Sequence, residues 1–222
     1  MSQPSTQSRV PARGRFITLE GIEGAGKSTV IAQIEQQLQR LDLQTLCTRE
    51  PGGTGIAESI RELVLAHHEQ EVLHPRAELL LVFAAREQHL AEVIRPALAA
   101  GIWVICDRFT DATLAYQGAG RGLDQARIRE LANWLHGDLW PDLTVLLDVP
   151  EPVGLARART RSEPDRFEIE KAEFFHRARE CYLALAKAEP GRYRVIDATA
   201  ALPAVAAAAR DIIDQFVADT PK

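Results

Sequence analysis

Lysine, cysteine and long apolar runs are all scarce in this sequence. Of its 26 basic residues only four are lysines, at Lys27, Lys171, Lys187 and Lys222. The three cysteines are far apart, which argues against a disulfide framework and a zinc site and fits a reducing, cytoplasmic compartment. Each lies in or beside an apolar segment, so we expect buried free thiols at Cys47, Cys106 and Cys181.

The missing features also narrow the class of protein. No stretch reaches the roughly 18 apolar residues of a membrane span, so we expect no membrane partner. A net charge of −5 argues against a nucleic-acid-binding surface, which would be basic. The 222 residues, 46% of them hydrophobic, are typical of a globular protein with a sizeable core. Residues 1–14 lack the apolar centre of a signal peptide and are expected to form a flexible tail, although a transit peptide stays open.

Short apolar runs alternate with amphipathic segments over residues 15–222. We expect a long helix at residues 78–100 and strands at residues 16–19, 43–48, 102–106, 143–149 and, more weakly, 194–197. This alternation predicts a single α/β domain of three layers, with helices on both faces of a five-stranded parallel sheet. Ligands of such sheets bind at the carboxyl ends of the strands.

The first expected strand leads into a glycine-rich segment of the pattern G-x-x-x-x-G-K-[ST], followed by a helical period. Backbone N–H groups of such a loop surround phosphate, and the helix N-terminus adds its positive dipole. A chance glycine turn is the alternative, but the strand before and helix after favour a P-loop NTPase fold that binds ATP. Lys27 would reach the β- and γ-phosphates, and Ser28 would ligate Mg²⁺. The nucleotide-binding residues are Gly21, Ile22, Glu23, Gly24, Ala25, Gly26, Lys27, Ser28 and Thr29.

Two acidic residues end expected strands. Asp107 follows the third strand, where a Walker-B-type acid holds Mg²⁺ directly or through water. The alternative for Asp107 is an internal ion pair with an arginine. Asp148 ends the fourth strand in the same way, and a solvated strand end is as plausible there as a functional role.

Further motifs make the chain similar to a known family. They are Thr48-Arg49-Glu50-Pro51-Gly52-Gly53-Thr54, Phe83-Ala84-Ala85-Arg86, Asp107-Arg108-Phe109, and Thr113, Tyr116 and Gln117 before a glycine-rich Gly118–Gly122. In this order and spacing they resemble thymidylate kinases, from about Arg15 to the C-terminal helix. The resemblance implies transfer of the γ-phosphoryl group of ATP to dTMP with Mg²⁺, giving dTDP for dTTP synthesis, by a cytoplasmic homodimer.

The resemblance also implies roles for charged residues near the phosphates. Glu23 would lie near the sugar 3′-hydroxyl and the phosphate pair, Arg49 at the acceptor phosphate, and Arg108 at the point of transfer. Guanidinium groups suit the last two places because they bind phosphate bidentately and stay charged. Surface ion pairs are the alternative for both arginines.

Other residues would bind the acceptor base and sugar. Arg86 would contact thymine, and an aromatic ring would stack on it. The family often has this ring four residues before the arginine, where this chain has Val82, so Phe83 is predicted to serve instead. The alternative for Phe83 is an ordinary core residue. Tyr116 would crowd the sugar 2′ position and so favour deoxyribose. Thr113 and Gln117 would contact the base and the acceptor pocket, with ordinary polar loop residues as the alternative.

A polar segment at about residues 154–168 is expected to form a mobile lid. Arg157 and Arg161 are spaced i, i+4 and so share a helical face. Because the P-loop lacks an arginine of its own, the chain resembles the bacterial type, in which lid arginines neutralise charge on the transferred group. Arg161 is the first candidate and Arg157 the second, with a solvated charged face as the alternative. The catalytic set is thus Lys27, Arg108, Arg161, Arg157 and Glu23.

Two rival functions remain at this point. A kinase for dUMP, GMP or AMP has the same P-loop, but the residues at 86, 113, 116 and 117 argue against a purine acceptor. A P-loop regulatory protein would be expected to show switch motifs such as D-x-x-G and N-K-x-D, and the chain has neither.

Overall fold

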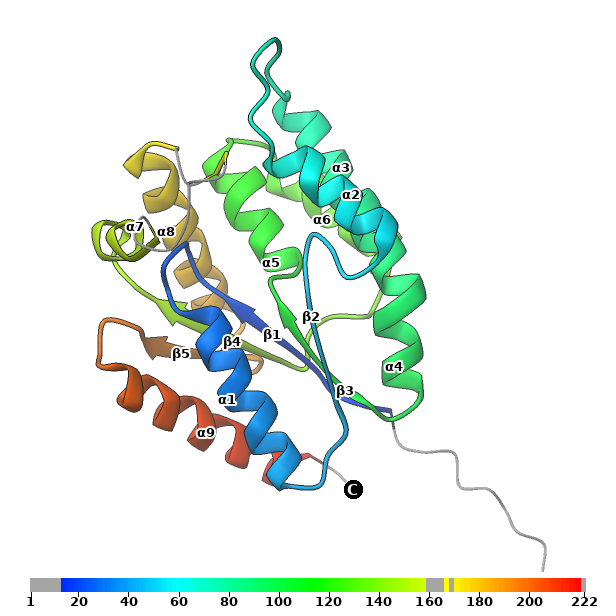
Figure 1. Ribbon diagram of the computed structural model, residues 1–222, viewed down its shortest axis with the longest axis vertical. Helices are drawn as coiled ribbons and strands as arrows, with labels where there is room; N and C mark the ends of the chain where they lie inside the picture. Colours follow the sequence, from blue (N-terminus) through cyan, green and yellow to red (C-terminus); the bar gives the residue numbers. More distant parts are fainter. Residues whose placement is uncertain (1–12, 159–165, 168–169, 221–222) are drawn as a thin grey trace, which may run out of the picture.

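The computed structural model describes residues 13–158, 166–167 and 170–220 (Figure 1). Five parallel strands form one sheet in the order β2-β3-β1-β4-β5. The strands are β1 (Phe16–Glu20), β2 (Thr45–Arg49), β3 (Trp103–Asp107), β4 (Leu143–Asp148) and β5 (Tyr193–Asp197). The predicted five-stranded parallel sheet is confirmed, and each strand lies within two residues of its expected position.

Helices cover both faces of the sheet (Figure 1). On one face, α1 (Lys27–Arg40) and α9 (Leu202–Asp219) pack together over Ile17 and Ile105, which belong to the larger core cluster. The other helices are α2 (Gly55–Leu65), α3 (Pro75–His89), α4 (Arg95–Ala99), α5 (Thr110–Thr113), α6 (Gln125–His136), α7 (Glu151–Ala158) and α8 (Ala172–Ala188), with π-helical turns η1 (Leu90–Ile94) and η2 (Leu114–Gly120).

The alternation of side chains along the central strands explains the two cores. Phe16, Val104 and Cys106 point to the opposite face from Ile17 and Ile105, and they form a second cluster with Leu90, Ile94 and Leu98. Successive strand residues face opposite sides, so strands covered on both faces must be apolar throughout. This is why β1 and β3 were recognisable as continuous apolar runs.

The long helix predicted at residues 78–100 has a different start and an interruption. It begins three residues earlier, at Pro75, where proline suits the first turn and the His74 side chain accepts a hydrogen bond from the Arg76 amide. The π-helical turn η1 then separates α3 from α4. A π-helical turn contains one residue more than an α-helical turn. Such an insertion shifts the hydrophobic periodicity only locally, so it cannot be recognised in the sequence of a helix with one continuous apolar face.

Two further expectations are corrected by the structure. The packed chain begins before residue 15, because Arg13 forms an ion pair with Asp142 at 3.2 Å and the Gly14 amide donates to the Leu98 carbonyl at 2.8 Å. Cys47 is exposed, whereas Cys106 and Cys181 are buried. Cys47 lies on β2, which is an edge strand of the sheet that the described residues form. None of the helices in the described ranges is long and apolar enough to cross a bilayer.

Candidate active site

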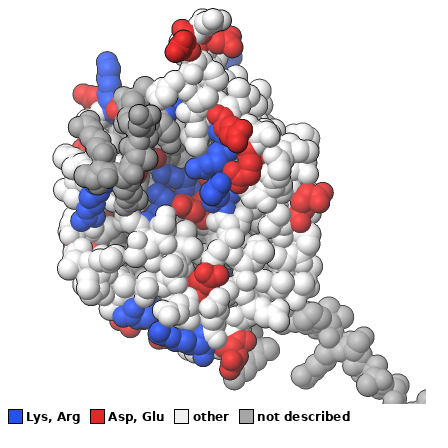
Figure 2. Space-filling model, in the orientation of Figure 1, with Lys and Arg blue, Asp and Glu red and all other residues white. Residues whose placement is uncertain are grey.

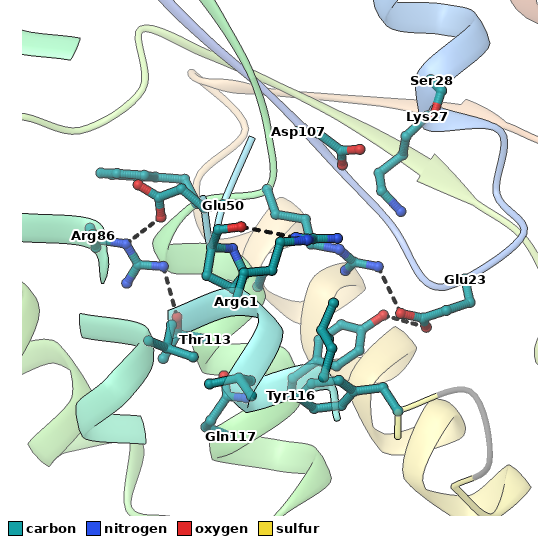
Figure 3. A pocket seen from close by; sticks show the side chains of 18 of the residues that line it. Glu23, Lys27, Ser28, Glu50, Arg61, Arg86, Asp107, Thr113, Tyr116 and Gln117 are labelled. Atoms are coloured by element: carbon teal, nitrogen blue, oxygen red, sulfur yellow. Dashed lines mark hydrogen bonds and ion pairs between the residues drawn. The ribbon is translucent and has the colours of Figure 1, made fainter. Parts of the chain in front are cut away.

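A cavity of about 300 Å³ opens where β1 and β3 end. On the face drawn in Figure 2, basic and acidic side chains gather in a hollow near the centre. In Figure 3, Lys27, Ser28 and Asp107 lie at one end of the cavity, and Arg86, Thr113 and Gln117 lie at the other. The carboxyl edge of the sheet is therefore where the predicted residues meet. Those that line the cavity are Glu23, Gly24, Gly26, Lys27, Ser28, Arg86, Asp107, Arg108, Thr113, Tyr116 and Gln117.

The glycine-rich loop between β1 and α1 is shaped by positive φ angles. Gly24 has φ 72°, and a side chain there would overlap the carbonyl oxygen of Gly154 on α7, so only glycine fits. Gly26, with φ 94°, turns the chain into α1. Lys27 then lies in the first turn, where its Nζ donates to the Gly21 carbonyl at 3.1 Å. Burial, with a smaller contribution from Arg108, lowers the pKa of Lys27. A bound phosphate would reverse this effect by supplying the missing negative charge.

Ser28 and Asp107 fit a magnesium site. The Oδ1 atom of Asp107 is buried and has no hydrogen-bond partner among the described residues. No ion pair joins Asp107 to an arginine within the described ranges, so the alternative of an internal ion pair is not supported. Oxygen ligands from one or two residues suit Mg²⁺, which completes its shell with water and phosphate oxygens. No group of three or more potential metal-ligating side chains occurs among the described residues.

Arg108, Glu23 and Tyr116 form a cluster in the middle of the cavity. Arg108 Nη2 donates to Glu23 Oε1 at 2.9 Å, and the Tyr116 hydroxyl donates to Glu23 Oε2 at 2.6 Å. The guanidinium lies 4.6 Å from the centre of the Tyr116 ring. Burial raises the pKa of Tyr116 well above its usual value, so its hydroxyl stays protonated and acts as a donor. Arg108 itself has φ 70°, an uncommon angle for a non-glycine residue, which re-aims its side chain at the end of β3.

Arg86 on α3 is almost fully buried, with 1% of its side chain exposed. Its Nε donates to Glu50 Oε2 at 2.6 Å, and Nη2 donates to the Thr113 hydroxyl at 3.0 Å. Its guanidinium carbon lies 5.0 Å from the ring centres of both Phe83 and Phe109. The remaining Nη1 is buried and has no hydrogen-bond partner in the described part of the chain. Buried donors are almost always paired, so this nitrogen indicates a place for an acceptor atom of a ligand.

Glu50 holds Arg86 in this position. Burial alone would raise the pKa of Glu50, but the adjacent Arg86 and His89 outweigh it and the pKa is lowered. His89 Nδ1 lies 3.1 Å from Glu50 Oε1, and its Nε2 lies 2.7 Å from the Thr48 hydroxyl. Glu50 therefore stays ionised and compensates the buried charge of Arg86.

Comparison with known proteins identifies the family. A family model described as "Thymidylate kinase" matches residues 19–209. A thymidylate kinase of Methylococcus capsulatus is 54% identical over 205 residues, which cover 92% of this chain and 97% of the relative. The chain belongs to the thymidylate kinase family. A relative from Pseudomonas savastanoi pv. phaseolicola is 56% identical over 204 residues, covering 92% of this chain and 97% of its own length.

A solved structure agrees in fold. The crystal structure of thymidylate kinase from Ehrlichia chaffeensis matches with a TM-score of 0.73 and 32% sequence identity, covering 91% of this chain and 99% of that one. The resemblance seen in the sequence motifs and the predicted P-loop NTPase fold are thereby confirmed. Thymidylate kinases phosphorylate dTMP to dTDP, so the predicted class of enzyme, a nucleotide kinase that uses ATP, is confirmed as well.

The aromatic residue predicted to stack on the acceptor base of this thymidylate kinase family member lies elsewhere. Phe83 is buried in the core against Arg86 and is not among the residues that line the cavity, whereas Val82 is. Consecutive helix positions differ by about 100° in direction. Position 82, one full turn before Arg86, therefore faces the cavity, and position 83 turns into the core. The position of Phe83 does not support the predicted contact.

Arg49, predicted to bind the acceptor phosphate, does not line the cavity either. Its side chain is 54% exposed and pairs with Glu58 at 2.8 Å. Arg61 lines the cavity instead, and its Nη1 donates to the Pro51 carbonyl at 2.9 Å. Sequence reasoning missed Arg61 because an arginine on the polar face of an amphipathic helix looks like a surface residue. The available signal was that Arg61 lies on the helix that directly follows the Arg49 motif.

Of the two catalytic lid candidates, Arg157 and Arg161, only Arg157 lies in the described part of the chain. Arg157 lies in the last turn of α7 and donates through Nη1 to the Ala198 carbonyl at 2.7 Å. Arg161, the first catalytic candidate, lies outside the described residues, and so does most of the expected lid, at residues 159–165 and 168. Asp148 pairs with Arg179 through two hydrogen bonds of 2.7 and 2.9 Å, which favours a structural role over a functional one.

Proposed function

We propose that this member of the thymidylate kinase family transfers the γ-phosphoryl group of ATP to the phosphate of dTMP, giving dTDP and ADP. The observation that carries the proposal is a cavity that joins a phosphate-binding loop to the buried Arg86, whose Nη1 has no hydrogen-bond partner among the described residues. Such a donor fits a carbonyl oxygen of a base. The phosphates of a nucleoside triphosphate at the loop and of a nucleoside monophosphate against Arg86 would meet between Lys27 and Arg108.

At the donor end, backbone N–H groups of residues 21–29 bind the phosphates of ATP, and Lys27 neutralises the β- and γ-phosphates. Ser28 and Asp107 would hold Mg²⁺, the latter directly or through water. The metal would neutralise the charge that develops on the β- and γ-oxygens. The buried Oδ1 of Asp107, which has no hydrogen-bond partner in the described part of the chain, supports its assignment.

In the middle of the cavity, Arg108 binds the phosphates at the point of transfer. Glu23 already accepts hydrogen bonds from Arg108 and Tyr116 and so orients both side chains. It also accepts a hydrogen bond from the sugar hydroxyl. Arg161 and Arg157 neutralise charge on the transferred group. Arg61 takes the acceptor-phosphate role first predicted for Arg49, because Arg61 lines the cavity. The protein performs almost no covalent chemistry; it aligns two phosphates and stabilises their charge.

At the acceptor end, Arg86 donates to a carbonyl of thymine, and Gln117 and Thr113 complete the polar contacts. The Val82 side chain packs on the base where an aromatic ring was predicted at Phe83. Tyr116 restricts the space beside the sugar and so selects deoxyribose. Its ring is held by the Arg108 guanidinium and by the hydrogen bond to Glu23.

A turnover assay with a panel of monophosphates tests the proposal. The protein, ATP and Mg²⁺ are mixed with dTMP, dUMP, GMP or AMP, and ADP release is measured. We expect the highest kcat/KM with dTMP. Arg86→Lys, which keeps a charge but loses the planar fork of donors, should reduce kcat/KM for dTMP at least about tenfold. Arg127→Lys is the matched control, because Arg127 is exposed on α6 and pairs only with Glu130 among the described residues. Equal turnover of all four monophosphates would contradict the proposal.

The same enzyme is proposed to act as a homodimer in the cytoplasm. Large apolar side chains are exposed on the neighbouring helices α2, α3 and α6 (Figure 1), namely Ile56, Leu63, Leu80 and Trp134. Two copies pairing through these helices would cover them. Free thiols and the use of ATP support a cytoplasmic location.

Analytical ultracentrifugation tests the dimer. We expect the wild-type protein to sediment as a dimer and Trp134→Glu to sediment as a monomer. Leu202→Glu, an equally drastic change at an exposed apolar position on α9, should leave the dimer intact. A wild-type monomer at micromolar concentration would overturn the assignment.

A further inference from the structure

Glu78, in the first turn of α3, is a fully buried carboxylate that does not line the cavity. It accepts hydrogen bonds from two segments that are distant from it in sequence. Gln117 Nε2 on η2 donates to Oε1 at 2.7 Å, and Arg166 Nη2 lies 2.5 Å from Oε2. Arg121, just after η2, lies 3.3 Å from the same Oε2 atom. One side chain thus joins α3, η2 and the chain that precedes α8.

The turn at residues 166–167 is attached to the cavity wall through this carboxylate. Arg166 donates through its amide to the Leu65 carbonyl at 3.3 Å and through Nε to the Val64 carbonyl at 2.8 Å. Val64 and Leu65 both line the cavity, and so does Phe167. The Phe167 ring centre lies 4.8 Å from the Arg166 guanidinium and 5.5 Å from that of Arg121. The two arginines that bind Glu78 therefore also hold the ring.

Glu78 also determines how Gln117 is oriented. An ionised carboxylate accepts hydrogen bonds but donates none, so the amide nitrogen of Gln117 must face it. The amide oxygen of Gln117 is then directed away from Glu78. Gln117 itself lines the cavity beside Tyr116. An unconstrained glutamine would rotate freely and lose side-chain entropy when it contacts a ligand. Fixing the amide in advance avoids most of that loss.

The charges of the cluster depend on Glu78. Arg121 and Arg166 each expose 14% of their side chains, and Glu78 exposes none. Glu170, which also pairs with Arg121, is the second carboxylate of the group. Removing the charge of Glu78 would leave two nearly buried guanidinium groups with one partly exposed carboxylate, which is costly unless the turn moves.

We propose that Glu78 is a positioning residue for acceptor recognition. It fixes the Gln117 amide and the Arg166–Phe167 turn as one wall of the acceptor end of the cavity. The inference rests on the proposed function and adds to it a residue that contacts neither substrate. Among the described residues, the side-chain hydrogen bonds and ion pairs of Glu78 go to Gln117, Arg121 and Arg166 and not to the phosphate-binding loop. Glu78 therefore acts on binding of the monophosphate and not on binding of ATP.

Steady-state kinetics of Glu78→Gln, with dTMP and ATP varied separately, test this. The change is nearly isosteric but removes the charge and allows the Gln117 amide to turn. We expect KM for dTMP to rise at least about tenfold while KM for ATP changes less than about twofold and kcat less than about threefold. The matched control is Glu130→Gln on the surface of α6, which should leave all three constants unchanged. Equal changes in both KM values would overturn the proposal.

A double-mutant cycle separates positioning from general destabilisation. If Glu78 acts through Gln117, Glu78→Gln should raise KM for dTMP much less in a Gln117→Ala background than in the wild type. Additive effects would show that the two residues are independent and would overturn the proposal.

Arg166→Met provides a second variant of the same wall, in case Glu78→Gln does not fold. It should also raise KM for dTMP selectively, and Glu78→Asp should restore part of the wild-type value. If neither Glu78→Gln nor Arg166→Met folds, the cluster is structural and the proposal fails. The proposed function is judged separately, because it stands or falls on the wild-type enzyme with the panel of monophosphates.

Discussion

The two ends of the cavity are built by different means. The donor end consists of one contiguous loop, residues 21–28, together with Asp107 from the next strand of the sheet. The acceptor end is assembled from side chains on α2, α3, α5, η2 and the turn at residues 166–167. Backbone N–H groups bind any nucleoside triphosphate in the same way, whereas convergent side chains recognise a particular base. Generality thus comes from local sequence, and selectivity comes from tertiary structure.

The ends also differ in how their charges are compensated. At the acceptor end, the buried Arg86 is paired with Glu50, and Glu78 is paired with Arg121 and Arg166. At the donor end, Lys27 donates only to carbonyl oxygens of its own loop among the described residues, and burial lowers its pKa. The buried ionised groups Arg86 and Glu78 at the acceptor end are therefore paired with opposite charges before a ligand arrives. The donor end gains its main stabilisation only when phosphate binds.

The sharpest test of this contrast is Lys27→Ala. If the donor end depends on this one ammonium group, kcat should fall at least about 100-fold, because a charge that stabilises the transferred phosphoryl group is lost. Alanine is a good helix former, so the fold should persist, as circular dichroism will show. Lys187→Ala, at an exposed position on α8, is the control and should retain full activity. More than about a tenth of wild-type turnover would show that the backbone loop suffices.

Arg161→Ala tests whether the lid belongs functionally to the transfer step and not to the acceptor end. We expect kcat to fall at least about tenfold with little change in calorimetric binding of dTMP, because the contact forms mainly in the transition state. Arg127→Ala on the surface of α6 is the control. Arg177 is unsuitable, since it donates to the carbonyls of Ala119 and Gly120 at 3.0 and 2.6 Å. A loss of dTMP affinity alone would assign Arg161 to the acceptor end.

A smaller effect is expected at the acceptor end from Tyr116→Ala. Removing the ring should reduce the preference for dTMP over its ribose analogue several-fold, measured as the ratio of the two kcat/KM values. Tyr116→Phe keeps the ring but removes the hydroxyl that donates to Glu23. This variant should keep the preference and lower only the common rate. Loss of the preference in both variants would assign the selection to the hydroxyl and Glu23.

The smallest expected effect is on the free energy of unfolding, and it comes from a residue of the sheet that lies beneath both ends of the cavity. Glu20 ends β1, is fully buried, and accepts hydrogen bonds from the Phe109 amide at 2.8 Å and the Tyr182 hydroxyl at 2.7 Å. Burial, and then the charge of Asp111, raise its pKa to about 8. The folded state thus binds more protons than the unfolded state between the ordinary glutamate pKa and pH 8. The free energy of unfolding should therefore fall as pH rises through this range.

Urea unfolding at pH 6.5 and pH 8 measures this dependence. Glu20→Gln should remove a decrease on the order of 1–2 kcal/mol over that interval. Most of the effect of His136 lies below this interval, because burial lowers its pKa from 6.5 to about 4 and so makes stability rise with pH between those two values. Glu130→Gln is the control and should keep the wild-type slope. Identical slopes in Glu20→Gln and the wild type would contradict the raised pKa.

Features encoded in contiguous residues were predictable. The phosphate loop lies in a single motif between an apolar run and a helical period, and β1 and β3 are apolar because both faces are covered. The exposure of Cys47 was not predictable, because it depends on β2 being an edge strand, and strand order is not written in any local pattern.

The acceptor end was predicted less well, because it depends on the direction in which each side chain points and not on proximity in sequence. Val82 and Phe83 are neighbours, and only the rotation of α3 decides which one faces the cavity. Arg49 and Arg61 carry the same charge on adjoining elements, and only packing of α2 brings Arg61 inward. The Glu78 cluster joins segments 39 and 88 residues apart, which no local periodicity reveals.

The exposed indole on α6 provides an optical signal. Trp134 is 80% exposed, whereas Trp103 is 7% exposed and lies against Phe216 at a ring-centre distance of 5.8 Å. Indole emission shifts to shorter wavelength and resists aqueous quenchers when water is removed from the ring. Acrylamide quenching across a dilution series would therefore follow coverage of α6 without any attached dye. Trp134→Phe would supply the background from Trp103 and Trp140.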